Sequence, residues 1–328
     1  MKRLSGSTAL LLISIAFATQ ARAANPEHVK QLLQTKECKG CDLSNARLKG
    51  ASLKGANLEG ANLEGVYLYK AYLVGANLSR ANIKSADLGD SNMQGINFSG
   101  SDLTDTNLKG NDMTGANFEN ANLSGAILEC NKRNRTKLGY ANLKKANLSN
   151  ANLKGVWLQS ANLAGADLNH ADLSPDTAES GRTIYTIYSN VSGANLKDAN
   201  LSDTNLYRAI FFRANLNNAK LTDANLNDAY LVMAQLMGAN LMKASLREAN
   251  LQRANLSNAN LSNADLVKSK LVDANLTNSI LKSARLVDIN MSGANLMGAD
   301  ISGAEMRKNK LCRVTMPDGT KTEDGCDK

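Results

Sequence analysis

A leucine, or another large apolar residue, returns every five residues along most of this chain. The segment Ala56–Gly65 shows the pattern clearly, because it is the word Ala-Asn-Leu-Glu-Gly written twice. An α-helix advances about 100° per residue, so a spacing of five would scatter these leucines around its surface. A straight strand alternates faces, so an odd spacing would send successive leucines to opposite sides. Neither regular element buries the whole set.

The conflict disappears if the backbone turns a corner in each five-residue word. The leucine and the residue two before it then point inward, and the other positions face water. Glycine, asparagine, aspartate and serine around the leucine supply the turn chemistry. Four corners would close a coil of about twenty residues, and coils would stack at about 4.8 Å, the spacing of hydrogen-bonded strands. The repeat therefore predicts a solenoid filled with leucine and alanine.

The word A(D/N)LXX resembles the repeat of the pentapeptide-repeat family and covers most of the chain after residue 40. This resemblance implies an all-β fold, a right-handed quadrilateral β-helix. Here we expect it in two segments, with a short N-terminal capping helix. The expected boundaries are 1–23 for a signal peptide, 24–40 for an N-terminal cap, 41–173 for the first stack, 174–188 for an inserted loop, 189–306 for the second stack and 307–328 for a C-terminal cap.

The first residues have the order of a secretory signal peptide. Lys2 and Arg3 precede an apolar run from Ala9 to Ala18, and Ala21-Arg22-Ala23 follows. We expect cleavage after Ala23, and the run is too short to span a membrane comfortably. The sequence thus predicts an exported protein in a periplasmic, thylakoid-lumenal or extracellular compartment, which is oxidising.

A short helix is expected directly after the cleavage site. Asn25 is suited to its N-cap, and Pro26 to its first position. Its apolar face would cover the open end of the coil, where unpaired backbone groups invite association. That face contains Val29, Leu32 and Leu33. We expect the neighbouring His28 to be a simple surface residue.

Five cysteines remain to be explained. Cys38 and Cys41 suggest a disulfide that pins the cap to the first coil. A thioredoxin-like redox site would need a βαβ context, and half a zinc site would need two more ligands. A second disulfide is expected between Cys312 and Cys326, with Cys130 left as a free thiol. Both ends resemble the cysteine-bearing caps of exported family members.

The regular frame breaks near Arg133. Counting places this residue above Met113 in the lumen, where an unpaired charge is costly. We therefore expect a bulge at about 130–136. Because Leu138 and Leu143 return in phase, the bulge is expected to replace part of one side.

Positive charge is concentrated around this bulge. The whole chain has a net charge of +8, and the segment from Glu129 to Lys154 alone carries +6. This predicts an anionic partner such as a lipid headgroup, a cell-wall polymer or an acidic protein, although a solvated loop would look the same. The candidate residues are Lys132, Arg133, Arg135, Lys137, Lys144 and Lys145.

Two groups of aromatic and apolar residues are expected on the outside of the coil. Tyr67, Tyr69 and Tyr72 form one exposed cluster, a hint of binding. Outward positions twenty residues apart form the other group, an apolar patch of Ile210, Phe212, Tyr230 and Val232. Either Ile184, Ile187 and Tyr188 of the inserted loop fold over this patch, or it is a partner or dimer site.

No sequence motif of catalysis is present. The chain has no Gly-rich phosphate loop, HExxH motif or nucleophile elbow, so we expect no enzyme, cofactor or metal site. The prediction is an exported scaffold that binds a protein or has a structural role, with an anionic polymer or membrane headgroup as the alternative partner. Nucleic acid is not expected, because the basic segment lacks interleaved aromatic residues. Some family members resemble DNA and bind topoisomerases, but those are acidic and cytosolic, so topoisomerase binding by mimicry is the weakest alternative.

Overall fold

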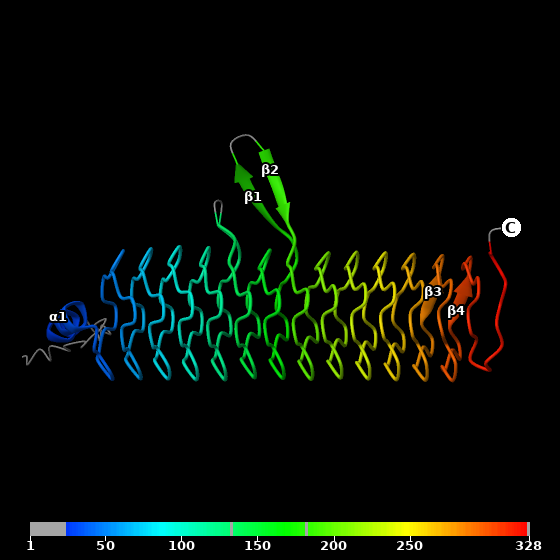
Figure 1. Cartoon of the computed structure of the whole chain (residues 1–328), viewed down its shortest axis with the longest axis horizontal. Helices are drawn as coiled ribbons and strands as arrows, with labels where there is room; N and C mark the ends of the chain where they lie inside the picture. Colours follow the sequence, from blue (N-terminus) through cyan, green and yellow to red (C-terminus); the bar gives the residue numbers. More distant parts are fainter. Residues whose placement is uncertain (1–23, 132–133, 181–182, 327–328) are drawn as a thin grey trace, which may run out of the picture.

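The computed structural model describes residues 24–131, 134–180 and 183–326, without the side chains of 178–180 and 183–184. The predicted signal peptide lies outside these residues. The backbone forms a long rod of stacked coils, with a helix at its N-terminal end and a hairpin projecting from its side (Figure 1).

Parallel bridges between residues twenty apart hold each coil to the next. Asn57, for example, is bridged to Asn77, and the Leu58 N–H donates to the Asn77 carbonyl at 2.7 Å. Four rows of bridges run along the rod and define its faces. We name them face A, face B, face C and face D, with Asn57, Asn62, Tyr67 and Tyr72 as their respective members.

Each corner without an insertion is a turn whose third residue has a positive φ. The turn after Leu58 is closed by a hydrogen bond from the Ala61 N–H to the Leu58 carbonyl at 3.0 Å, and Gly60 has a φ of 63°. Leu58 and Ala61 are fully buried. Each five-residue word thus makes one side and one corner, as its spacing predicts.

The lumen is a continuous column of apolar side chains. Leucine and alanine fill most positions, and larger residues meet one coil apart. The rings of Phe98 and Phe118 stack with centroids 5.1 Å apart. Such close packing explains why few aromatic residues fit inside.

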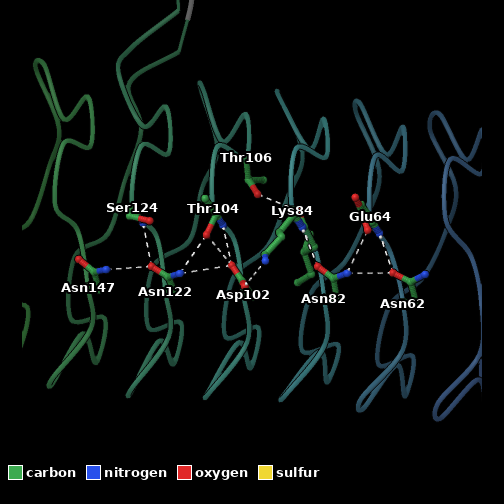
Figure 2. Close-up of polar contacts among 11 residues, drawn as sticks. Asn62, Glu64, Asn82, Lys84, Asp102, Thr104, Thr106, Asn122, Ser124 and Asn147 are labelled. Carbon is green, nitrogen blue, oxygen red and sulfur yellow. Dashed lines mark hydrogen bonds and ion pairs between the residues drawn. The ribbon is translucent and has the colours of Figure 1, made fainter. Parts of the chain in front are cut away.

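The asparagine and aspartate before each leucine stabilise both the corner and the stack. In Figure 2, Asn122 accepts from the Ser124 backbone N–H at 3.2 Å, and Asn147 donates to Asn122 at 3.0 Å. The same row contains Asp102, which receives a hydrogen bond from Asn122 at 3.4 Å and pairs with Lys84 at 3.1 Å. These side-chain ladders continue the backbone ladder on the outside of the rod.

Helix α1 (Pro26–Thr35) closes the N-terminal end. The Asn25 side chain caps it by accepting from the Glu27 N–H at 3.0 Å, and Leu32 is fully buried. Two expectations were wrong. Leu33 is 46% exposed, so it does not cover the coil. His28 is half-buried, and its Nδ1 accepts the Asp42 N–H at 2.9 Å, which ties the helix to the first coil.

The C-terminal end is closed differently. Strands β3 (Arg285–Val287) and β4 (Glu305–Arg307) are parallel parts of successive coils. The coil does not stop at residue 306, because a parallel bridge still joins Asn295 to Thr315. After a turn, the chain runs back antiparallel over the last coil, where the Leu311 N–H donates to the Asp324 carbonyl at 3.1 Å.

The bulge adds residues instead of replacing part of a side, which corrects the expectation. Beyond it, bridged residues are 25 apart, as in Asn117 and Asn142. The chain therefore has five extra residues between Cys130 and Thr136. Leu138 takes the place above Met113 that counting had assigned to Arg133. An insertion of five keeps the phase of the repeat, so the sequence could not distinguish it from a regular side.

The inserted loop is a hairpin of β1 (Asp176–Ser180) and β2 (Thr183–Ile187), paired antiparallel. Across it, the offset between bridged residues is 33, as in Asp172 and Asn205, so thirteen extra residues leave the coil. Bridges continue on both sides of the hairpin. The two sequence segments therefore form one uninterrupted stack.

Candidate interaction edge

Both insertions leave the rod at the corner between face C and face D, which we call the CD edge. The bulge follows Ile127 on face C and precedes Lys137 on face D, and the hairpin lies between Asp172 and Asn190 on the same two faces. One regular coil, with its corner at Gly155, separates them. Both insertions project from the same side of the rod (Figure 1).

Gly155 lets the two insertions meet. Its φ is 63°, and an added Cβ would lie 2.9 Å from Cys130 Sγ, 2.9 Å from Asp176 Cβ and 3.2 Å from Ile187 Cγ2. A side chain at this corner would therefore push apart the root of the bulge and the root of the hairpin. The glycine is required by space as well as by its conformation.

Arg135 joins the bulge to the hairpin. Its Nε donates to the Gly155 carbonyl at 2.7 Å, and its guanidinium also donates to the carbonyls of Val156 and Tyr188. It lies 5.9 Å from the centroid of the Trp157 ring. Burial lowers the pKa of this guanidinium. Because its donors are directed at backbone carbonyls, Arg135 is not an exposed anion-binding residue as the sequence suggested.

Cys130 lies under the same junction. Its thiol is buried and contacts the Gly155 carbonyl at 3.4 Å. Burial raises the pKa of the Cys130 thiol, and the Thr136 backbone opposes this only in part. Thr136 itself is buried, and its hydroxyl donates to the Glu129 carbonyl at 2.8 Å, closing the base of the bulge.

The other predicted basic residues do not form one patch. Each five-residue step carries the chain to the next face, so Lys137 is on face D while Lys144 and Lys145 are at the corner between faces A and B. Lys137 pairs with Asp112 at 3.5 Å, and Lys144 pairs with Glu119 at 3.7 Å. Lys132 and Arg133 lie outside the described residues.

The predicted apolar patch is brought together beside the hairpin. Ile210 and Tyr230 are bridged neighbours on face D, and the rings of Phe212 and Tyr230 are 6.3 Å apart. Val232 is only 9% exposed, so it adds little to the exposed patch. A pocket of about 610 Å³ opens here. Its lining residues are Tyr188, Arg208, Ile210, Asp228 and Tyr230.

Among the described side chains of the hairpin region, Tyr188 covers this patch at its margin. Tyr188 lines the pocket, but Ile187 points to Gly155 and the side chain of Ile184 lies outside the described residues. Sequence reasoning missed the rim of the pocket, where Arg208 and Asp228 form an ion pair at 3.4 Å. Their spacing of twenty residues was the available signal, because it places them one above the other.

The two predicted cysteine pairs are disulfide-bonded in the structure, Cys38 with Cys41 and Cys312 with Cys326. Within the described ranges, the one cluster with metal-ligand chemistry is Cys312, Glu323 and Cys326. Two of its three donors are joined to each other, so it is not a ready metal site. None of the described helices is both long and apolar enough to cross a membrane.

Comparison with known proteins identifies the repeat. A family model described as "Pentapeptide repeats" matches eight copies along the chain. The matched residues are 37–65, 61–100, 91–129, 135–174, 189–228, 211–242, 244–282 and 281–308. No curated protein matches the chain.

Several solved structures are similar to it. HetL, a pentapeptide repeat protein involved in heterocyst differentiation regulation in Nostoc sp. strain PCC 7120, is 29% identical over 80% of this chain and 91% of its own, with a TM-score of 0.29. QnrB1, a plasmid-mediated fluoroquinolone resistance protein, is 21% identical over 72% and 89%, with a TM-score of 0.29. A protein from the Arabidopsis thaliana thylakoid lumen is 26% identical over 36% and 69%, with a TM-score of 0.17.

Proposed function

Because this chain belongs to the pentapeptide-repeat family, whose fold is a right-handed quadrilateral β-helix, we propose that it is a non-enzymatic scaffold that holds a partner protein at its CD edge. The family membership supports a structural or interaction role. We choose the CD edge because a pocket lies between the base of the hairpin and face D.

The pocket has the composition of a protein-binding site. Tyr188 and Tyr230 are 39% and 41% exposed, and together with Ile210 they leave a cluster of apolar surface uncovered on the rod. Tyrosine and arginine are enriched where binding energy is concentrated. Arg208 and Asp228 at the rim would orient polar groups of the partner.

Strand β2 supports the same assignment. It is on the side of the hairpin that faces the C-terminal half of the rod (Figure 1), and it leads directly to Tyr188. A two-stranded ribbon is marginal by itself and gains from an added strand. We therefore expect an extended segment of the partner to lie along β2 and place an apolar side chain in the pocket.

Export is part of this proposal. The order of residues 1–23 is that of a signal peptide, and two disulfides fit an oxidising compartment. The basic segment does not favour the anionic alternative, since Lys137, Lys144 and Lys154 are all paired with acids.

Capture of partners from the exported fraction, with quantitative mass spectrometry, tests the proposal. The variant Ile210→Ser with Tyr230→Ser removes the pocket floor and should lower recovery of the partner about tenfold or more. Its matched control is Ile280→Ser with Tyr140→Ser, which removes the same residue types from exposed positions elsewhere.

A second variant removes the hairpin cleanly. Deleting residues 175–187 leaves Ser174 followed by Tyr188 and restores the spacing of twenty between Asp172 and its bridged neighbour. The rod should remain folded by circular dichroism, and the partner should be lost. The proposal would be overturned if both variants captured the same proteins in the same amounts as the parent.

A further inference from the structure

The N-terminal end of the CD edge contains a second surface that the proposed function does not use. Arg47 and Tyr67 are bridged neighbours on face C, and Lys49, Tyr69 and Lys70 follow at the corner. We call these five residues the tyrosine platform. It is separated from the pocket at Tyr230 by the bulge and the hairpin.

The two tyrosine rings are stacked on each other. Tyr67 and Tyr69 have centroids 6.1 Å apart, and their planes differ by only 12°. The Tyr69 hydroxyl donates to Asp90 Oδ2 at 2.7 Å, which fixes this ring. That hydrogen bond raises the pKa of Tyr69, so the hydroxyl stays a donor. Because the two rings stack, a ligand ring would contact Tyr67 on the face that is turned away from Tyr69.

The cations around these rings form no ion pair with the acidic residues that the structure describes. The Lys49 and Lys70 Nζ atoms lie 5.9 Å and 5.3 Å from the centroid of Tyr69. Among the described residues, no ion pair involves Arg47, Lys49 or Lys70, and all three are exposed. Two ammonium groups near one ring repel each other, so an anion close to both is favoured.

A depression lies beside the platform. It has a volume of about 500 Å³ and is lined by Asn45, Arg47, Gly65 and Tyr67. Gly65 keeps it open, because a Cβ there would lie 2.5 Å from Asn45 Oδ1. The guanidinium, the tyrosine ring and the depression are thus adjacent, which allows one ligand to use all three.

We propose that the tyrosine platform binds an acidic polysaccharide. A sugar ring would lie in the depression against Tyr67 with its carboxylate or sulfate near Arg47, and neighbouring units of the polymer would reach Lys49 and Lys70. The charge complementarity selects an anion, and the Tyr67 ring beside the depression selects a ring-shaped repeating unit.

Two other anionic partners fit less well. A membrane surface is bound by aromatic and aliphatic side chains that insert below the headgroups, whereas the Tyr69 hydroxyl is held at Asp90. A nucleic acid needs a longer track of cations, and here Asp87 and Asp90 border the platform. A short site for one or two anionic groups remains.

Titration calorimetry of the full exported chain with polygalacturonate tests this inference. The variant Arg47→Ser, Lys49→Ser, Lys70→Asn should weaken binding about tenfold or more. Asparagine is chosen at residue 70 because its φ is 59°. The matched control, Lys137→Ser with Lys144→Ser and Lys154→Ser, removes the same charge from ion-paired positions and should bind within about twofold of the parent.

A second variant tests the rings. Tyr67→Ser leaves every cation in place and should also weaken binding, while fully methyl-esterified polygalacturonate, which lacks the charge, should bind no variant. Absence of binding by the parent, equal loss in the ion-paired control, or binding only to phosphatidylglycerol vesicles or to a single-stranded oligonucleotide would each overturn the inference. None of these outcomes depends on the pocket at Tyr230.

Discussion

Every corner of the coil that carries no insertion depends on one residue with a positive φ. Glycine has this conformation at many corners before the bulge, such as Gly60 and Gly95, whereas larger residues such as Met233 and Lys243 adopt it after the hairpin. A left-handed conformation costs a residue with a Cβ roughly 1–2 kcal/mol. The coil therefore contains local strain that the burial of leucine and alanine offsets.

Tyr140 provides a direct measure of this strain. Its φ is 58° and its side chain is 69% exposed, so little packing is lost on truncation. We expect Tyr140→Gly to raise the free energy of unfolding by up to about 1 kcal/mol, since glycine adopts this φ freely. The control is Tyr72→Gly on face D, which is 41% exposed and has no positive φ, and which should be destabilising. Denaturant unfolding of both variants gives the comparison, and destabilisation by Tyr140→Gly would contradict the prediction.

Asp102 on face B makes a pH-dependent contribution to the stability of the fold (Figure 2). Burial alone would raise the pKa of its carboxyl, but hydrogen bonds from Thr104 and the charge of Lys84 outweigh it, and the net effect lowers the pKa. A carboxylate with a lowered pKa adds stability above the unfolded value of about 3.9, and this is lost as the pH falls through the folded value.

The variant Asp102→Asn isolates this contribution, because asparagine occupies the same position in neighbouring coils. At pH 7 it should be less stable by about 0.5–1 kcal/mol, and the difference from the parent should shrink on acidification. Thermal unfolding at pH 7 and pH 3 measures it. A difference that stays constant between these pH values would exclude the carboxylate as its source.

The stability of the hairpin depends on the contacts at its base. Two strands alone are marginally stable, and the described contacts that hold β1 and β2 to the rod gather at Gly155, Cys130 and Arg135. The bulge therefore acts as a support for the hairpin, and the two insertions behave as one unit.

Replacing Arg135 by Ala should loosen this unit without unfolding the rod. It removes the donors to the carbonyls of Gly155, Val156 and Tyr188, at a cost of about 1–3 kcal/mol confined to the junction. Hydrogen exchange should accelerate in residues 174–190 but not in the distant coils. Lys137→Ala, which breaks only an exposed ion pair, is the control. Unchanged exchange in Arg135→Ala would show that the hairpin does not depend on the bulge.

The sequence predicted the elements that follow from the five-residue step, and it failed where an insertion or a contact between coils decides the outcome. The columns at Phe98 and Phe118 follow from counting alone. The bulge was expected to replace part of one side, whereas it adds residues. The sequence could not show this, because five added residues keep the phase of the five-residue repeat. Arg135 was grouped with other cations because its partner carbonyls, at Gly155 and Tyr188, are distant in sequence. Lysines that are close in the sequence lie on different faces of the rod, because each five-residue step turns the coil to the next face.

The whole molecule is a chain of nearest neighbours closed at both ends. Each coil contacts the one before and the one after, so stability depends on local interfaces and on the terminal caps. At the N-terminus helix α1 and the Cys38–Cys41 disulfide provide the cap. At the C-terminus an antiparallel return and the Cys312–Cys326 disulfide do so.

Removing the C-terminal disulfide should expose the last coils first. The variant Cys312→Ser with Cys326→Ser opens a loop of sequence separation 14, which the chain-entropy model values at about 3 kcal/mol. We expect faster hydrogen exchange in residues 305–326 and no change near residue 100. The pair Cys38→Ser with Cys41→Ser, which opens a loop of separation 3 at the other end, is the comparison. A uniform loss of protection along the rod would contradict the nearest-neighbour description.

The bridges of face C also set a distance. Six steps separate Tyr67 in the tyrosine platform from Asn205 beside the pocket, which corresponds to about 29 Å at the strand spacing. Because one coil contains twenty residues, losing or gaining a coil between them would change this distance by about 4.8 Å and leave both sites pointing in the same direction. The rod therefore fixes the distance between the tyrosine platform and the pocket, and a glycan and a protein bound at these two sites would keep a constant separation.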